Sequence, residues 1–135
     1  MGYNLEILIV EDELLIAEML KDMLLEMDFN VIGIAKNFQT SIELLHRNSK
    51  INFAILDINL NETNTGFDVA KVLREMSIPF IFLTSYSDKK TIQDALVFEP
   101  NAFLIKPFSK LDLYTTLEIA KSKAKQSSKF IIIKD

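Results

Sequence analysis

The sequence predicts an α/β fold: a doubly wound, five-stranded parallel sheet with helices on both faces. Short apolar segments alternate with amphipathic segments along the 135 residues, and this alternation is typical of parallel strands joined by crossover helices. Three of the apolar segments end abruptly in charged residues, as buried parallel strands do where they leave the sheet. Ligands bind at that carboxyl edge in open α/β sheets, so we expect the functional site there.

The predicted strands are short and rich in Ile, Val, Leu or Phe, a composition that favours buried strands. In chain order they are Leu5–Val10, Phe29–Ala35, Asn52–Asp57, Pro79–Thr84 and Ala102–Lys106. Each is followed by a segment with polar residues and then by a helical pattern. This order of elements gives five repetitions of a strand and a helix.

The predicted helices carry apolar residues at the i, i+3 and i+4 spacing of an amphipathic helix. In chain order they are Glu13–Met27, Asn37–Arg47, Gly66–Met76, Ser87–Phe98 and Ser109–Lys125. The apolar stripe of the first helix consists of Ile16, Met19, Leu20, Met23, Leu24 and Met27. We interpret its methionines as core residues rather than cofactor contacts, because Met fills irregular gaps in protein cores.

Composition excludes several classes of protein. A chain of this length forms one domain, and its 49% hydrophobic and 25% charged content argues against disorder. No apolar run approaches the ~20 residues that span a bilayer, and the N-terminus lacks the pattern of a secretory signal. We therefore expect a cytoplasmic protein that does not contact membranes. Cysteine is absent, which excludes disulfides and thiolate metal sites, and the net charge of −4 argues against broad nucleic-acid binding by this domain.

The loop after the first strand is acidic, because Glu11 and Asp12 directly follow Ile7–Val10. A nucleotide-binding fold would have glycines here, whose N–H groups bind phosphate at the start of the helix. Acidic side chains repel phosphate and attract cations, so a dinucleotide or flavin site is disfavoured. Acidic residues at a helix start can also simply complement the helix dipole, and for these two residues alone that alternative stays open.

Asp57 follows four apolar residues at the end of the third strand, which lies beside the first strand in a doubly wound sheet. Glu11, Asp12 and Asp57 are therefore expected to share one pocket, where their repulsion calls for a divalent cation and a nearby ammonium. Lys106 supplies the ammonium, and oxygen ligands suit Mg²⁺. A carboxylate held in this way is a nucleophile for phosphoryl transfer, and the Thr84 hydroxyl could hydrogen-bond the transferred group.

These residues resemble the receiver domain of two-component response regulators over about Leu5–Lys123. The matching segments, in the family's order and spacing, are Ile7–Glu13, Leu56–Ile58, Phe82–Ser85 and Lys106–Phe108. The resemblance implies the flavodoxin-like strand order 2-1-3-4-5. It also implies a signalling switch that accepts a phosphoryl group from a sensor histidine kinase or phosphotransfer protein onto Asp57. Such a domain catalyses only its own phosphorylation and dephosphorylation.

The resemblance further implies how Mg²⁺ is bound. Asp12 and Asp57 would bind the ion directly, and Glu11 mainly through water. Asn59 would contribute its backbone carbonyl oxygen. The peptide bond that joins Lys106 to the residue after it, a proline, is expected to be cis.

Signal output is implied to depend on a switch. Thr84 turns toward the phosphoryl group, and Phe103 rotates into the space that Thr84 leaves. Asn59 and Tyr86 lie where the family tunes the lifetime of the phosphoryl group. The fourth helix, fifth strand and fifth helix are the face through which the phosphorylated family members commonly form homodimers.

The C-terminal residues predict a segment outside the receiver-like domain. Lys121–Lys129 is polar and resembles a linker, and Phe130–Asp135 has the composition of a strand. We therefore expect a receiver domain over residues 1–124, followed at 125–135 by a linker and the start of an output domain or a tail. Lys129–Lys134 resembles the opening strand of a LytTR-type DNA-binding domain. Any contact with DNA would then come from that output domain, which would control transcription.

Two other functions share parts of this pattern. A haloacid dehalogenase-like phosphatase also uses an Asp nucleophile, Mg²⁺ and Lys, but it usually has the nucleophile at the first strand and a second Asp two residues on. Here the first strand carries the acidic pair, and Asn59 stands two residues after Asp57. A pseudo-receiver, which binds its partners without phosphorylation, is the other alternative.

Overall fold

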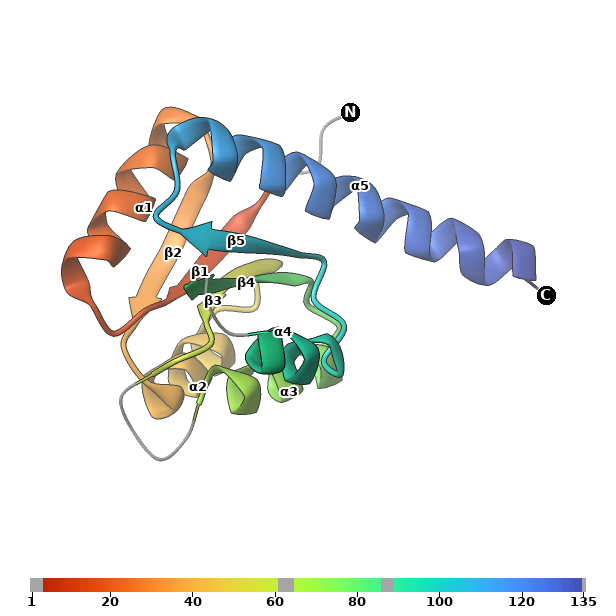
Figure 1. Cartoon of the computed structure of the whole chain (residues 1–135), viewed down its shortest axis with the longest axis horizontal. Helices are drawn as coiled ribbons and strands as arrows, with labels where there is room; N and C mark the ends of the chain where they lie inside the picture. The colour runs from red at the N-terminus through yellow and green to blue at the C-terminus, as the bar shows by residue number, and fades with distance from the viewer. Residues whose placement is uncertain (1–3, 61–64, 86–88, 135) are drawn as a thin grey trace.

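A computed structural model describes residues 4–60, 65–85 and 89–134, and the side chains only as far as Lys123. The described chain forms one sheet with the strand order β2-β1-β3-β4-β5, in which every neighbouring pair is parallel. Helices cover both faces of this sheet (Figure 1). The predicted fold class and strand order are therefore confirmed.

The strands lie within one residue of their predicted bounds. They are β1 (Glu6–Val10), β2 (Asn30–Ala35), β3 (Phe53–Asp57), β4 (Phe80–Ser85) and β5 (Ala102–Lys106). All five residues of β3 are buried, and so are all but one residue of β1 and of β4. Strands buried on both faces read as continuous apolar runs, which is why the sequence located them so closely.

The helices are α1 (Leu14–Glu26), α2 (Phe38–Arg47), α3 (Gly66–Glu75), α4 (Lys89–Leu96) and α5 (Lys110–Lys134). Figure 1 shows α1 and α5 on one face of the sheet and the other three on the opposite face. Each face has its own core: Ile7 and Ile9 pack with α1 and α5, whereas Leu8 and Val10 pack with α2, α3 and α4. Successive side chains of a strand point to opposite faces, so β1 supplies both cores.

The predicted core stripe of α1 is wrong at Met19, whose side chain is exposed. The fully buried residues of this helix are Ala17, Leu20 and Leu24, which follow one another at spacings of three and four residues. The other two methionines of the stripe pack partly against the same core. Ala17 therefore takes the place on the buried face that the prediction gave to Met19.

The strand predicted over Phe130–Asp135 is also wrong, because α5 continues as a helix through Lys134; Asp135 lies outside the described residues. The preceding segment, Lys121–Lys129, contains neither Gly nor Pro, the residues that most often end a helix. Figure 1 shows the end of α5 projecting beyond the sheet, where none of the described strands lies beside it to pair with backbone groups. No helix of the described residues has the length and apolar character to cross a membrane.

The start of α3 is fixed by a capping box between Thr65 and Asp68. The Phe67 N–H donates to Thr65 Oγ1 over 3.1 Å, and the Thr65 N–H donates to Asp68 Oδ2 over 2.8 Å. Both bonds satisfy N–H groups that the first turn of a helix leaves without partners. This cap positions the helix that follows the loop after Asp57.

Replacing Thr65 with Ala is expected to lower the free energy of unfolding by about 1 kcal/mol, the usual cost of losing an N-cap side chain. Urea denaturation followed by circular dichroism measures the change. The control is Thr115→Ala, which changes an exposed threonine inside α5 and should leave stability unchanged or slightly raised, since Ala favours helices. Equal losses in the two variants would contradict the capping role.

Candidate functional site

The carboxyl ends of β1, β3 and β5 bring the predicted acidic and basic residues together. Glu11 and Asp12 follow β1, Asp57 ends β3, and Lys106 ends β5. One carboxylate oxygen from each of the three acidic residues lies within 4.8 Å of the other two. The sheet order therefore places the three carboxylates as the sequence predicted.

Lys106 joins two of these carboxylates. Its Nζ lies 2.9 Å from Glu11 Oε1 and 3.0 Å from Asp57 Oδ2. The Glu11 side chain is fully buried, and those of Asp57 and Lys106 are 6% and 19% exposed. Ion pairs so shielded from water are screened little by salt. The peptide bond between Lys106 and Pro107 is cis, as the resemblance implied.

In Glu11 and Asp57, the carboxylate oxygen that does not face Lys106 accepts a hydrogen bond from a backbone N–H group. The Asn59 N–H donates to Asp57 Oδ1 over 3.0 Å, and the Glu13 N–H donates to Glu11 Oε2 over 3.1 Å. Glu11 Oε1 is buried and accepts no well-aligned hydrogen bond from the described residues, although the ammonium of Lys106 is close. A buried carboxylate oxygen without such a bond has capacity for a further cationic partner.

Burial raises the pKa of Glu11 to about 7; the Lys106 ammonium and the Glu13 N–H act against this rise, and Asp57 adds to it. Burial also acts to lower the pKa of Lys106, but the negative charges of Glu11 and Asp57 close to its ammonium outweigh that effect, so its pKa lies above the ordinary value. The lysine is therefore charged near neutral pH, while Glu11 is poised between its two protonation states. A shared site with this charge balance favours a divalent cation over a proton as pH rises.

The two predicted switch residues lie on neighbouring strands, Thr84 near the carboxyl end of β4 and Phe103 on β5, three residues before Lys106. Thr84 is buried at the end of β4, and its hydroxyl donates to the Ser85 carbonyl over 3.2 Å. Phe103 is half-buried, and its ring centroid lies 6.0 Å from that of Phe82. Tyr86 lies outside the described residues. The hydroxyl of Thr84 is thus bonded to the backbone and not to the acidic cluster.

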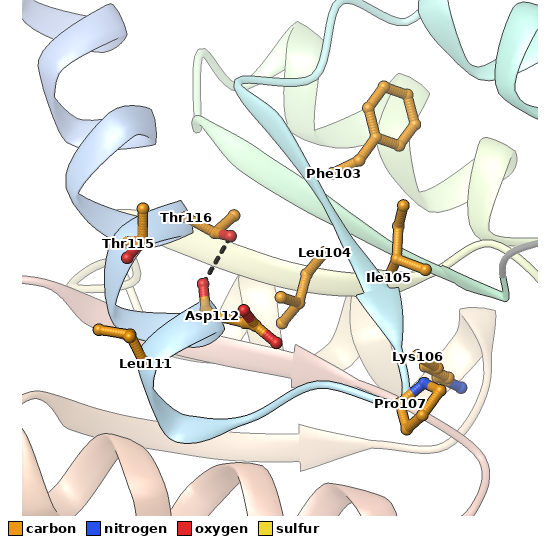
Figure 2. A pocket seen from close by; sticks show the side chains of 9 residues that line it. All are labelled: Phe103, Leu104, Ile105, Lys106, Pro107, Leu111, Asp112, Thr115 and Thr116. Atoms are coloured by element: carbon orange, nitrogen blue, oxygen red, sulfur yellow. Dashed lines mark hydrogen bonds between the residues drawn. The ribbon is translucent and has the colours of Figure 1, made fainter.

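An open groove of about 580 Å³ runs between β5 and the first turns of α5. Figure 2 shows the side chains that line it, among them Phe103, Ile105, Leu111 and Thr115. Leu111 is 70% exposed and Ile105 is 38% exposed. This groove lies on the face where the resemblance implies that homodimers form, and it contains the predicted switch residue Phe103.

Sequence reasoning did not single out Gly66, although it lies against the backbone of the site. Gly66 is the first residue of α3, and its N–H donates to the Ile58 carbonyl over 3.0 Å. The available signal was a glycine at a helix start, where alanine has the higher helix propensity. Such a glycine often marks a close approach of two backbones.

Comparison with known proteins gives one consistent family. The family model described as "Response regulator receiver domain" matches residues 7–118. The transcriptional regulatory protein PdtaR of Mycobacterium tuberculosis (strain ATCC 25618 / H37Rv) is 32% identical over 121 residues, which cover 89% of this chain and 58% of that protein. The sensory transduction protein LytT of Bacillus anthracis is 35% identical over 128 residues, which cover 91% of this chain and 49% of that protein. The chain therefore spans about half the length of these relatives.

Solved structures agree with this result. The signal receiver domain of a modulated diguanylate cyclase from Desulfovibrio desulfuricans G20 superimposes with a TM-score of 0.79 at 29% identity. The match covers 93% of this chain and 99% of that one. The likeness therefore extends over nearly the whole of both chains.

Proposed function

The chain belongs to the response regulator receiver domain family, a family of signalling domains, and from this premise we propose that it is a switch activated by phosphorylation of Asp57. The observation that carries the proposal is the position of the Lys106 ammonium, 2.9 Å from Glu11 and 3.0 Å from Asp57, beside a third carboxylate from Asp12. A carboxylate held by an ammonium and next to further acidic ligands is suited to accept a phosphoryl group.

The residues present fit a bound Mg²⁺. They offer only oxygen ligands, and one of these, the buried Glu11 Oε1, lacks a well-aligned hydrogen bond among the described residues. Asp12, Asp57 and the Asn59 carbonyl would hold the ion, and Glu11 would act mainly through water. Mg²⁺ would supply positive charge that neutralises the oxygens of the phosphoryl group.

In the proposed reaction a carboxylate oxygen of Asp57 attacks phosphorus and forms an O–P bond. The bond from phosphorus to the donor breaks at the same time, and the leaving group takes its electron pair. Before the reaction, the Lys106 ammonium donates a hydrogen bond to Asp57 Oδ2. From this position it can donate instead to an oxygen of the incoming phosphoryl group. Because this ammonium is already fixed between two carboxylates, it stabilises the developing charge with little reorganisation.

The signal would leave the site through Thr84 and Phe103. The Thr84 hydroxyl would exchange the Ser85 carbonyl for a phosphoryl oxygen, and Phe103 would move into the vacated space. Since Phe103 lines the groove between β5 and α5, its movement would change the surface through which we propose homodimers form. Phosphorylation shifts this equilibrium only by its differential stabilisation of one state. Asn59 and Tyr86 are proposed to tune the lifetime of the phosphoryl group.

The proposed partners are a sensor histidine kinase or a phosphotransfer protein as phosphoryl donor. The likeness to PdtaR, which is named as a transcriptional regulatory protein, supports an output domain that acts on transcription. The division into a receiver over residues 1–124 and a linker or output segment over 125–135 is part of this proposal. DNA contacts would belong to the output domain.

Intact-mass measurement after incubation with acetyl phosphate tests the proposal. The wild-type chain is expected to gain one phosphoryl group only when Mg²⁺ is present, and Asp57→Asn is expected to gain none, because an amide is not a nucleophile here. The control is Asp94→Asn, which changes an exposed carboxylate of α4 and should react as the wild type does. A wild-type chain that gains no mass would favour a pseudo-receiver, and continued release of phosphate would favour a phosphatase.

A further inference from the structure

Gly66 lies in direct contact with the backbone that carries the phosphoacceptor. A Cβ atom added at this position would lie 2.1 Å from the Asp57 carbonyl oxygen, 2.9 Å from Ile58 Cα and 3.0 Å from the Asp57 carbonyl carbon. All three are backbone atoms, which cannot rotate out of the way as the end of a side chain can. Any residue other than glycine must therefore move either α3 or the peptide unit of Asp57.

Both sides of this contact are held in place. On the α3 side, the Gly66 N–H donates to the Ile58 carbonyl over 3.0 Å, the capping box fixes Thr65, and the next turn is anchored by the buried Val69. On the strand side, the Ile58 N–H donates to the Leu83 carbonyl over 3.1 Å, which continues the pairing of β3 with β4. A clash at Gly66 would therefore press directly on the peptide unit of Asp57.

We propose that Gly66 is a positioning residue for phosphoryl transfer. Its missing side chain lets α3 close on the Asp57 backbone, and this contact holds the carboxylate at 3.0 Å from the Lys106 ammonium. Gly66 acts through Asp57 and touches no reacting atom. The inference rests on the proposed function and names a residue that sets the geometry of the same site.

Gly33 provides a matched control inside the same fold. A Cβ atom added there would lie 3.1 and 3.2 Å from the two terminal carbons of the Leu44 side chain. Leu44 is half-buried, so its side chain can shift by a few tenths of an ångström. Gly33→Ala therefore makes the same chemical change on β2, but the new Cβ would meet only the Leu44 side chain and neither backbone atoms nor Asp57.

Gly66→Ala is expected to lower the maximal rate of phosphorylation by acetyl phosphate about a hundredfold, because a displacement of about 1 Å at a reacting group costs that much. It is also expected to weaken Mg²⁺ binding, measured by calorimetry without any phosphoryl donor. Both measurements are made at a temperature below the thermal unfolding transition of the variant, which circular dichroism locates. A loss of stability alone would leave the Mg²⁺ affinity of the folded fraction unchanged. Gly33→Ala should match the wild type in both measurements.

A second measurement uses the wild-type chain and does not depend on the folding of a variant. The sequence contains only 3 glycines, so labelling with ¹⁵N-glycine gives a simple spectrum in which Gly33→Ala identifies one resonance by its loss. Gly66 lies against the Asp57 peptide, so its resonance should shift with Mg²⁺ concentration in proportion to the Mg²⁺ occupancy measured by calorimetry. The Gly33 resonance should not move.

The outcomes separate this inference from the function on which it rests. A wild-type chain that is phosphorylated, together with a Gly66→Ala variant that reacts and binds Mg²⁺ as the wild type does, overturns the inference alone. A Gly66 resonance that stays fixed at saturating Mg²⁺ also overturns it. A wild-type chain that accepts no phosphoryl group overturns both the proposed function and the role of Gly66.

Discussion

Replacing Lys106 with Met is expected to slow phosphorylation of Asp57 by acetyl phosphate about a hundredfold to a thousandfold, the usual cost of removing one preorganised donor from a developing negative charge. Met keeps most of the apolar stem of the lysine and removes the ammonium. In the structure this ammonium is within 3.0 Å of both Glu11 and Asp57, and the side chain is only 19% exposed. The charge is therefore fixed beside the attacking oxygen before the donor arrives.

Mg²⁺ affinity distinguishes this role from simple damage to the site. Removing a positive charge from beside the three carboxylates should leave Mg²⁺ binding unchanged or make it tighter, while the reaction becomes slower. A variant that had lost the fold would lose both. Calorimetric titration with Mg²⁺ and the rate of mass gain, measured on the same preparation, give the two quantities.

The matched control for Lys106→Met is Lys110→Met. Lys110 begins α5, is 54% exposed, and pairs with Glu26 at the surface, where ion pairs contribute little. This variant should be phosphorylated at the wild-type rate. If Lys106→Met reacted within about threefold of Lys110→Met, the ammonium of Lys106 would be only a structural partner of the two carboxylates, and the proposed reaction would lose its charge-stabilising group.

The acidic cluster could be predicted from the sequence because strand ends are marked by abrupt changes from apolar to charged residues. Asp57 ends the fully buried β3 and Lys106 ends the edge strand β5, and the order of a doubly wound sheet places the first and third strands side by side. Residue type and position along the strand were then enough to bring the carboxylates and the ammonium together. Packing detail was not needed for this step.

Other features could not be read from the sequence, because they depend on distances that no periodic pattern encodes. The close approach of Gly66 to the Asp57 carbonyl depends on the angle at which α3 meets the sheet. The exposure of Met19 depends on which side of α1 the sheet covers. The raised pKa of Glu11 depends on how completely its side chain is buried. At the C-terminus, an apolar run that resembled a strand continues a helix, since helical hydrogen bonds need no neighbouring strand.

In the absence of Mg²⁺, the stability of the protein is expected to contain a component from Glu11 that decreases as pH rises from about 4.5 to about 7. Burial raises the pKa of Glu11 from 4.5 to about 7, so the folded chain binds this proton more tightly than the unfolded chain does. The favourable component is fully present below the unfolded pKa and is lost as pH rises through the folded one. Two and a half pKa units correspond to about 3 kcal/mol for this buried group.

Glu11→Gln should remove that component, because Gln resembles the protonated acid and does not titrate. Between pH 5 and pH 8 the wild type should therefore lose up to about 3 kcal/mol of unfolding free energy that the variant does not lose. Glu13→Gln, which changes an exposed residue two positions along, should follow the wild type. Parallel pH profiles for all three proteins would mean that Glu11 ionises in the folded chain as it does in the unfolded one.

The same proton should compete with Mg²⁺ for the site. Because metal ligands must be deprotonated, a group with a pKa of about 7 makes Mg²⁺ affinity rise about tenfold between pH 6 and pH 8 and then level off. Titrations in buffers of different ionisation enthalpy should show that proton release falls from nearly one per ion at pH 6 to almost none at pH 8. In Glu11→Gln the affinity should be lower and nearly constant over this range. A flat profile in the wild type would separate Glu11 from the metal site and leave its burial beside Lys106 as a purely structural feature.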